Sequence, residues 1–332
     1  GGNHYGLRNG RIDRTAWKQT FIQYITTRII DVHLHRKPYD EEIWGDVKTI
    51  MAQVFTQDQI SSFDDYRNKS IACYISEYIT GNRFIDACEK NRVPFCKTDF
   101  LTDFKGTEQK VFVTHNSDYP INEERFRHGP KKFKHWLALN KEYDNDSITA
   151  IPVGLESMFL RVNNTSRLGR YSSPGWPNAI DKANYMDKIA KQKLDHDKLI
   201  YLNFNPATYP IEREKIIQLY KDKPWVTYQA GATWKDFYDQ IATHKFVFSP
   251  RGNGVDCHRI WESLYLRTIP IVKRHSSLDD FKDLPILFVD NWDEISVDFL
   301  NKKYNEMLTR PYDLSKMKIS YWEKRIGELL DE

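Results

Sequence analysis

The segment from Phe246 to Val272 holds a dense set of residues that can bind an anion, and it reads FVFSPRGNGVDCHRIWESLYLRTIPIV. Gly252 and Gly254 allow backbone N–H groups to approach a ligand closely, because neither carries a side chain. Arg251 and Arg259 offer fork-shaped sets of donors that suit phosphate oxygens. The residue types and their spacing therefore indicate a site for a phosphate-bearing ligand.

The hydrophobic pattern of this segment predicts a strand, a flexible loop, a helix that begins near Asp256 and a second strand. The N-terminus of such a helix favours an anion. Glu262 lies one turn beyond Arg259 and can accept hydrogen bonds from ribose hydroxyls, so the set suits a nucleoside diphosphate. The alternative for the glycine loop alone is a tight strand-to-helix turn whose charges face water.

A second group of polar residues follows another predicted strand, at 198–202, earlier in the chain. Asn203, Asn205 and Thr208 follow an apolar run, and Arg213 falls in the first turns of the next predicted helix. Open α/β sheets bind ligands at the carboxyl ends of their strands. Helix capping and turn formation explain the Asn and Thr residues equally well, and one residue can serve both purposes.

The whole segment resembles the exostosin-like family of glycosyltransferases, including its viral and bacterial relatives, through Ser-Pro-x-Gly, Arg-x-x-Glu and Ile-Pro-Ile-Val. The resemblance is strong over 245–290, weaker over 198–215 and scattered over 110–158, and the first 65 residues show none. It implies that Arg251 or Arg259 contacts a donor diphosphate and Glu262 its ribose. Arg267 departs from the pattern, since relatives usually have Gly or another small residue there. The predicted donor-binding residues are Asn203, Asn205, Thr208, Arg213, Ser249, Arg251, Gly252, Asn253, Gly254, His258, Arg259 and Glu262.

The loop after the predicted strand 110–114 carries the candidates for chemistry. An acceptor hydroxyl needs a general base, and Asp118 is the first candidate, with His115 second. Related enzymes with a His-Asn-x-Asp loop use it on the acceptor side, so we assign Tyr119 to acceptor binding. Glu156, at the end of the strand predicted at 149–153, resembles a further family piece that faces the same cleft; it could bind acceptor or donor sugar hydroxyls, and we assign it to the acceptor. Asp before Tyr-Pro is also a common turn former, and Glu156 also fits a plain surface carboxylate.

Alternating strands and helices predict an α/β fold with parallel sheets, and the resemblance implies two Rossmann-like domains that face across a cleft (the GT-B type). We predict an acceptor domain over 1–160, a linker over 161–196, a nucleotide-sugar domain over 197–310 and a C-terminal helix over 311–332. Helices are predicted at 15–34, 40–66, 81–91, 131–141, 180–193, 211–221, 233–243, 257–266, 294–308 and 313–331. Strands are predicted at 70–76, 95–100, 110–114, 149–153, 198–202, 225–228, 245–248, 269–272 and 284–289.

Composition limits the other functional classes. With 49 basic and 46 acidic residues, the net charge of +3 gives no case for nucleic-acid binding. The sequence contains no run of 18 apolar residues, so it predicts no membrane span. The four cysteines show no zinc spacing, and Asp144 and Asp146, which could pass for a metal-binding DxD, follow a predicted helix instead of a strand. The start at Gly1 lacks Met, so we expect the sequence to begin inside a longer chain, either cytoplasmic or, with an anchor removed, from the Golgi lumen.

The sequence therefore predicts an enzyme that moves a hexosyl or pentosyl group from a UDP- or GDP-linked sugar to a hydroxyl of an oligosaccharide or glycoconjugate. By resemblance it inverts the anomeric configuration, and no metal or other cofactor is expected. Two alternatives remain open at this point: an inactive nucleotide- or carbohydrate-binding protein of the same fold, and a nucleotide-sugar epimerase.

Overall fold

The computed structural model describes residues 7–8, 11–12, 59–60, 62–68, 76–106, 108–157, 178–192 and 194–332. Residues Gly1–Gln57 and Asp58–Glu332 are two compact units. In the first unit, β1 (Leu7–Arg8) pairs antiparallel with β2 (Arg11–Ile12). The predicted helix at 15–34, most of the helix at 40–66, nearly all of the strand at 70–76 and residues 161–177 of the predicted linker lie outside the described residues.

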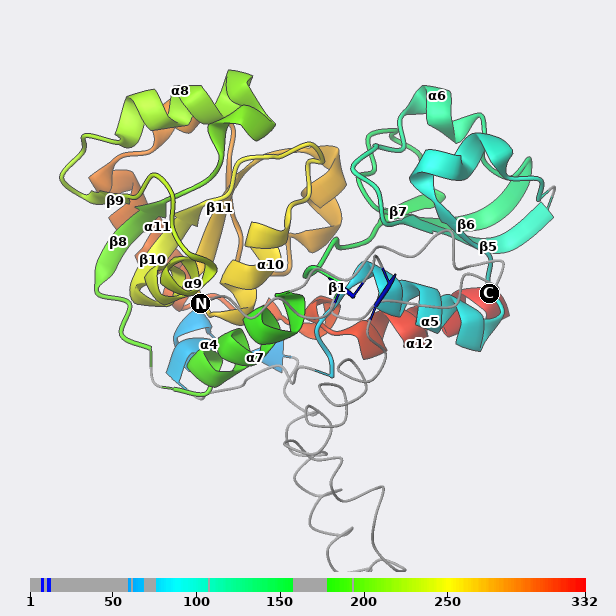
Figure 1. The fold of residues 1–332 in the computed structure, drawn as a ribbon, viewed down its shortest axis with the longest axis horizontal. Coiled ribbons are helices and arrows are strands. Elements are labelled where there is room, and N and C mark those ends of the chain that lie inside the picture. Colours follow the sequence, from blue (N-terminus) through cyan, green and yellow to red (C-terminus); the bar gives the residue numbers. More distant parts are fainter. Residues whose placement is uncertain are drawn as a thin grey trace, which may run out of the picture. The chain divides into compact units, whose positions relative to one another are not determined.

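The second unit contains a four-stranded parallel sheet in the order β4-β5-β6-β7 (Figure 1). Its strands are β4 (Phe95–Lys97), β5 (Glu108–His115), β6 (Lys132–Ala138) and β7 (Ile148–Ala150). Helix α5 (Gly81–Asn91) begins at Thr80, whose side chain accepts from the Arg83 N–H, and it packs against α12 (Ile319–Asp331). The predictions for 81–91 and 110–114 are confirmed.

The helix predicted at 131–141 is wrong, because these residues form β6. This strand pairs with β5 on one side and β7 on the other, and Trp136 stands opposite Phe112. Trp136 is fully buried, and its Nε1 donates to the Thr114 hydroxyl at 2.9 Å. Pairing with two neighbouring strands overrides the helical propensity of Lys, Leu and Ala. The strand predicted at 95–100 ends at Lys97 and continues as the 3₁₀ helix η1 (Thr98–Asp103).

A second parallel sheet, in the order β12-β11-β10-β8-β9, contains the anion-binding segment. Its strands are β8 (Lys198–Leu202), β9 (Val226–Tyr228), β10 (His244–Phe248), β11 (Ile269–Lys273) and β12 (Leu287–Val289). Its helices are α8 (Pro210–Tyr220), α9 (Trp234–Thr243), α10 (His258–Tyr265) and α11 (Val297–Leu308). Every element predicted between 198 and 272 is confirmed to within about two residues.

The central strands of this sheet carry runs of apolar residues that are buried, which is typical of parallel strands covered on both faces. Phe246, Val247 and Phe248 of β10 are fully buried, and so is Ile271 of β11. Trp261 of α10 is buried too, and its ring meets Phe281 edge-on with centroids 5.2 Å apart. This core fixes the position of the loop between β10 and α10.

Shorter elements complete the described part of the chain. They are β3 (Gln59–Ile60), α4 (Phe63–Asn68), α6 (Glu123–Phe126), α7 (Ala179–Ala190), η3 (Pro206–Thr208), η4 (Ser276–Phe281), η5 (Trp292–Glu294), β13 (Tyr312–Asp313) and η6 (Ser315–Met317). Helix α7 confirms the helix predicted at 180–193 and packs against α9 and α10. The predicted helix at 313–331 begins later, at Ile319, after β13 and η6.

Arg267 now has a structural explanation. Its φ of 60° is the left-handed conformation that glycine adopts more readily than other residues. The Arg267 side chain is buried, and its guanidinium donates to the carbonyls of Arg67, Ala190 and Gln192. The backbone strain is therefore offset by hydrogen bonds that hold the ends of α4 and α7.

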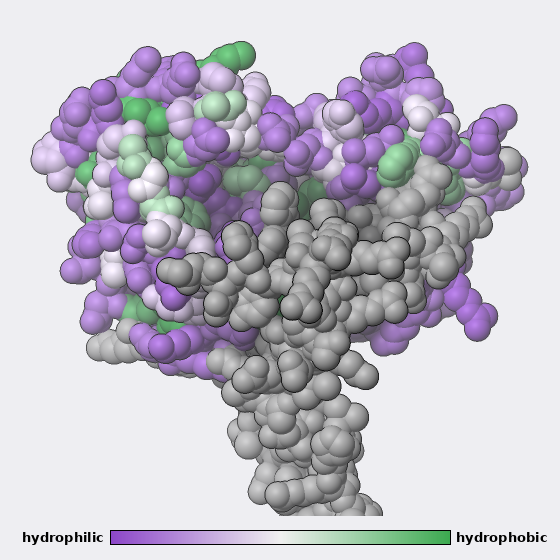
Figure 2. Space-filling model, in the orientation of Figure 1, coloured by the Kyte–Doolittle hydropathy of each residue, from purple (hydrophilic) through white to green (hydrophobic). Residues whose placement is uncertain are grey.

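The structure thus confirms the α/β class with parallel sheets. Figure 2 shows a surface dominated by hydrophilic residues on the described part of this face. The exposed large hydrophobic residues among those described are scattered: Tyr119, Ile211 and Tyr228. Within the described ranges, no helix is both long enough and apolar enough to cross a membrane.

Candidate functional site

The glycine loop joins β10 to α10 and approaches a residue from the other sheet very closely. A Cβ at Gly254 would lie 2.6 Å from Asn140 Nδ2, so only glycine fits without a shift. At Gly252 a Cβ would lie 3.3 Å from an η-nitrogen of Arg213. Helix α10 begins at His258, two residues after the predicted start near Asp256, and the N-cap residue Cys257 makes no side-chain capping bond.

Two arginines around this loop pack against aromatic rings and have N–H donors without a hydrogen-bond partner in the described part of the chain. The Arg259 guanidinium lies 5.6 Å from the Phe204 ring centroid and 5.4 Å from that of Phe237. Arg251 lies 4.6 Å over Tyr209 and donates weakly to the Asn253 carbonyl at 3.4 Å. The Nε atoms of both arginines are buried and have no hydrogen-bond partner among the described residues. Unsatisfied guanidinium donors fit a place for an anion, although Arg267 Nε is unsatisfied in the same way in a structural position.

Arg213, also predicted to contact the donor, uses its guanidinium on the backbone. It donates to the carbonyls of Arg251 and Asn205, both at 2.8 Å, and to that of Pro250 at 3.4 Å. Burial, together with the nearby charge of Arg259, lowers the pKa of Arg213 to about 10. Arg213 therefore connects the loop after β8 to the glycine loop and helps to hold both loops in position.

The polar residues after β8 serve partly as caps, as the alternative interpretation held. Asn205 Oδ1 accepts from the Ala207 N–H at 3.0 Å, and Asn203 Nδ2 donates to the Gln229 carbonyl at 2.7 Å. The Thr208 methyl group lies next to Gly252, 3.5 Å from where its Cβ would be. Ser249 is buried at the end of β10. All four lie at the carboxyl ends of β8 and β10, although their side chains face protein groups.

Glu262, the predicted ribose contact, is half-buried on α10. Its Oε1 accepts from the Tyr238 hydroxyl at 2.8 Å. Burial raises the pKa of this carboxyl, while the charges of His258 and Arg259 act in the opposite direction. Glu262 and Tyr238 line a small recess together with Glu156 and Lys182. A ribose hydroxyl at this place would meet a carboxylate that is already oriented by a tyrosine.

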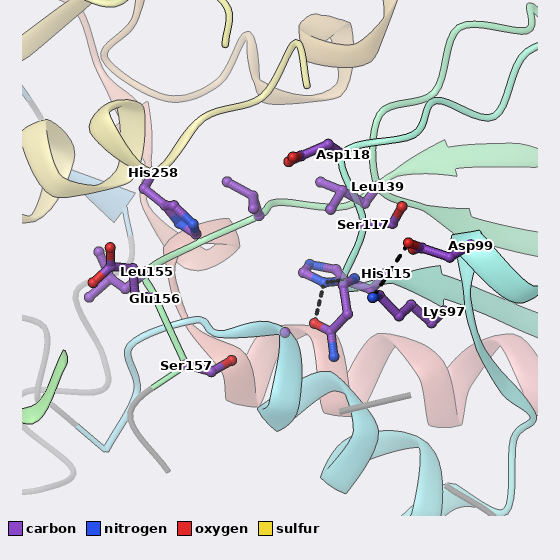
Figure 3. Close-up of a pocket in the computed structure, with 13 residues that line it drawn as sticks. Lys97, Asp99, His115, Ser117, Asp118, Leu139, Leu155, Glu156, Ser157 and His258 are labelled. Carbon is purple, nitrogen blue, oxygen red and sulfur yellow. Dashed lines mark hydrogen bonds and ion pairs between the residues drawn. The ribbon is translucent and has the colours of Figure 1, made fainter. Parts of the chain in front are cut away.

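A pocket of about 240 Å³ is lined by both candidate bases, His115 and Asp118, and by Glu156 of the predicted acceptor residues (Figure 3). Its walls come from the end of β4, the loop after β5, the segment after β7 and the first residue of α10. His258, predicted on the donor side, lines this pocket, and Tyr119 is outside its lining and half exposed, with the Arg125 guanidinium 4.6 Å over its ring. The lining residues are Gly81, Lys97, Asp99, His115, Asn116, Ser117, Asp118, Leu139, Val153, Leu155, Glu156, Ser157 and His258.

His115 is buried in the pocket wall, and its ring stacks on Phe84 with centroids 5.0 Å apart. Nε2 lies 2.9 Å from the Pro152 carbonyl oxygen, which only accepts, so Nε2 carries the proton. Nδ1 in turn accepts from the Asn116 N–H at 2.7 Å. Burial lowers the His115 pKa to about 4. Both ring nitrogens are therefore engaged, which argues against His115 as the base.

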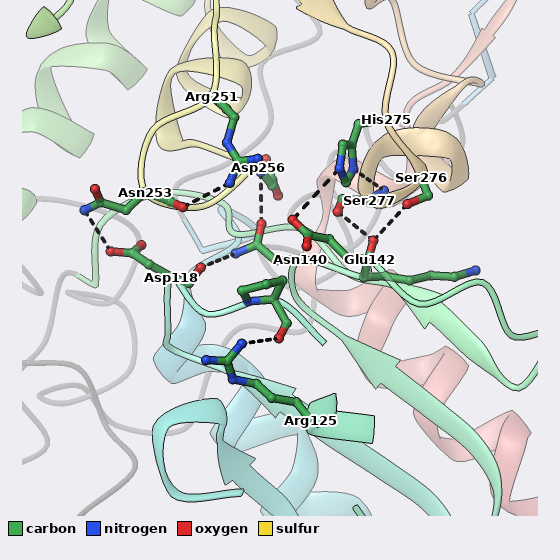
Figure 4. Close-up of polar contacts among 12 residues, drawn as sticks. Asp118, Arg125, Asn140, Glu142, Arg251, Asn253, Asp256, His275, Ser276 and Ser277 are labelled. Carbon is green, nitrogen blue, oxygen red and sulfur yellow. Dashed lines mark hydrogen bonds and ion pairs between the residues drawn. The ribbon is translucent and has the colours of Figure 1, made fainter. Parts of the chain in front are cut away.

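Asp118 is exposed at the edge of the pocket and reaches the glycine loop. Its Oδ2 accepts from Asn253 Nδ2 at 3.2 Å, and its carbonyl lies 3.5 Å from Asn140 Nδ2 (Figure 4). The loop that was predicted to bind the acceptor therefore touches the loop that was predicted to bind the donor.

A buried polar junction that the sequence interpretation missed lies beneath this contact. Asp256 accepts from the Val153 N–H at 2.6 Å and from Trp261 Nε1 at 2.8 Å, and its own N–H donates to Asn140 Oδ1 at 3.0 Å. Burial raises the Asp256 pKa to about 7, although these hydrogen bonds oppose the rise. Asn140 has a φ of 53°, which Asn tolerates better than most residues.

The DxD pair Asp144 and Asp146 is exposed in the loop between β6 and β7, so it follows a strand and not the helix that was predicted before it. Among the residues that the structure describes, no three His, Cys, Asp or Glu side chains are grouped so that they could hold a metal ion. No protein-family model matches the chain, and no curated protein is significantly similar to it.

Proposed function

We propose that this protein is a glycosyltransferase that binds a UDP- or GDP-linked sugar on the glycine loop and an acceptor in the adjacent pocket. The observation that carries the proposal is the pair Arg251 and Arg259, which aromatic rings hold in place with buried, unpartnered Nε donors. A diphosphate supplies the acceptor oxygens that these donors lack, and bidentate arginine–phosphate pairs are among the stronger charge-assisted hydrogen bonds.

The position of the site in the fold supports the same conclusion. The glycine loop follows β10, the 203–208 loop follows β8, and the pocket is lined from the loops after β5 and β7. These are the carboxyl ends of parallel strands in two sheets, where α/β proteins bind nucleotides. We therefore propose a two-domain architecture of the GT-B type, with the domain boundaries predicted from the sequence and the ligands between the two sheets.

In the proposed reaction, an acceptor hydroxyl attacks the anomeric carbon from the side opposite the leaving diphosphate. The bond from that carbon to the phosphate oxygen breaks, and the configuration inverts. Arg251, Arg259 and the N-terminus of α10 neutralise the charge that develops on the diphosphate. These groups supply fixed positive charge, so the proposed reaction requires no divalent metal.

A nucleotide panel tests the binding half of this proposal. The full chain is heated with UDP, GDP, ADP, CMP and a set of UDP- and GDP-linked sugars, and the midpoint of thermal unfolding is measured. A ligand at 100 times its dissociation constant stabilises a folded protein by about 2.7 kcal/mol, which is an easily measured shift. The proposal expects a shift with UDP or GDP derivatives that exceeds the shift with ADP and CMP. Equal or absent shifts for all of them would reject it.

A further inference from the structure

The His258 ring has one nitrogen fixed by the backbone and one left for a ligand. Nδ1 lies 2.8 Å from the Gly154 carbonyl oxygen. A carbonyl only accepts, so Nδ1 carries the proton, and in the neutral ring Nε2 holds the lone pair. No described residue makes a hydrogen bond to Nε2, and Figure 3 shows the ring projecting from the start of α10 toward the pocket.

Other titratable groups in the lining already have protein partners. Glu156 pairs with Lys182 at 2.8 Å, Lys97 lies 3.5 Å from Asp99, and Asp118 accepts from Asn253. The two ring nitrogens of His115 are occupied, as described above. Among the described side chains that line the pocket, His258 is the histidine that has a ring nitrogen without a protein partner, whereas each carboxylate already has one polar contact.

The backbone around Gly154 keeps the histidine in this orientation. Gly154 has a φ of 66°, and a Cβ there would lie 2.3 Å from the Ile79 carbonyl oxygen. No other residue fits at 154, so the carbonyl that accepts from Nδ1 is held in one position. This is the arrangement in which a carbonyl sets the tautomer and direction of a basic histidine.

The neighbour of His258 in the chain links the pocket to the proposed donor site. Arg259 follows directly on α10 and lies between Phe204 and Phe237 in the glycine-loop region. The proposed function places a diphosphate on Arg259, and His258, the preceding residue, lines the pocket proposed for the acceptor.

We propose that His258 Nε2 is the general base that takes the proton from the acceptor hydroxyl. This inference rests on the proposed function. As the acceptor oxygen bonds to the anomeric carbon, its proton moves to Nε2, and the electron pair of the broken carbon–oxygen bond leaves with the nucleoside diphosphate. Asp118, at the edge of the same pocket, contacts the acceptor but does not take the proton.

The test uses His258→Asn and His258→Ala in the full chain. Asn keeps an N–H that can donate to the Gly154 carbonyl and removes Nε2, whereas Ala leaves space for an added base. His128→Asn, an exposed histidine on the turn before β6, is the matched control. Release of UDP or GDP is followed with the panel's best nucleotide sugar, with p-nitrophenyl glycosides and water as acceptors. Nucleotide affinity is measured by calorimetry.

We expect both His258 variants to lose at least about 100-fold in kcat, which is the usual contribution of a general base. Nucleotide affinity should stay within about 3-fold of the wild type, and added imidazole should restore part of the activity to His258→Ala but not to His258→Asn. His128→Asn should behave as the wild type. Near-normal kcat in His258→Asn would overturn the role of His258. So would a larger loss of kcat in Asp118→Asn than in either His258 variant. A wild type that binds neither UDP nor GDP would instead reject the proposed function.

Discussion

Replacement of Arg259 by Ala separates a ligand-binding role from a structural one. The guanidinium makes no hydrogen bond to a described protein group, and its contacts are with the faces of Phe204 and Phe237. In the absence of nucleotide, the variant loses two cation–π contacts and also removes a buried donor without a partner. These effects oppose each other, so the free energy of unfolding should change by less than about 1 kcal/mol.

Nucleotide affinity should respond much more strongly to the same change. A hydrogen bond to a charged group contributes about 1.5–3 kcal/mol, which corresponds to roughly 10- to 150-fold in the dissociation constant. Arg259→Lys should fall between the wild type and Ala, because it keeps the charge but loses the fork and the planar stacking.

The assay is isothermal calorimetry with UDP and GDP, together with urea unfolding of the same preparations. Arg325→Ala is the control, since Arg325 pairs with Glu328 and Glu332 on the surface of α12. Unchanged affinity in Arg259→Ala would refute the assignment of the donor site. A loss of several kcal/mol of stability would mean that Arg259 serves mainly to hold the fold.

Three further predictions concern transfer, metals and pH. Asp118→Asn should reduce transfer about 10-fold, as expected for one lost hydrogen bond to the acceptor, with nucleotide affinity intact; near-normal turnover removes Asp118 from the site. Transfer activity should be unchanged in the presence of EDTA. A complete loss of activity that Mn²⁺ or Mg²⁺ restores would instead support a metal site at Asp144 and Asp146. Burial lowers the His244 pKa to about 4, so the unfolded state binds a proton first as the pH falls below about 6.5. This histidine should therefore contribute about 2 kcal/mol less stability at pH 5 than at pH 7, and His244→Gln should show a correspondingly smaller difference in urea unfolding.

Local sequence pattern predicted the second sheet well, because its strands are short apolar runs between clear turn residues. The run 245–248 and the helix at 257–266 needed no tertiary information. The residues at 132–138 could not be predicted without tertiary information. Lys, Leu and Ala suit a helix, and only pairing with β5 and β7 makes this segment a strand. Arg267 shows the same limit, because its three carbonyl partners come from distant parts of the chain.

The candidate site was predictable as a set of residues but not as a geometry. Residue types and spacing were enough to name Arg251, Arg259 and Asp118 as candidates. Nothing in the local sequence indicated that the Arg213 guanidinium donates to backbone carbonyls. The orientation of His258 in the pocket depends on Gly154, about one hundred residues earlier. Such contacts depend on how the two sheets pack, and no single segment contains that information.

The central claim is that the chain transfers a sugar from a nucleoside diphosphate to a hydroxyl. The direct measurement incubates the full chain with the sugar-labelled donor selected by the panel and an array of oligosaccharide acceptors, and analyses both products. Our account predicts equal amounts of free UDP or GDP and of a labelled glycan with inverted anomeric configuration. Tight nucleotide binding without product across the whole array, or an epimerised nucleotide sugar with no nucleotide released, would contradict it.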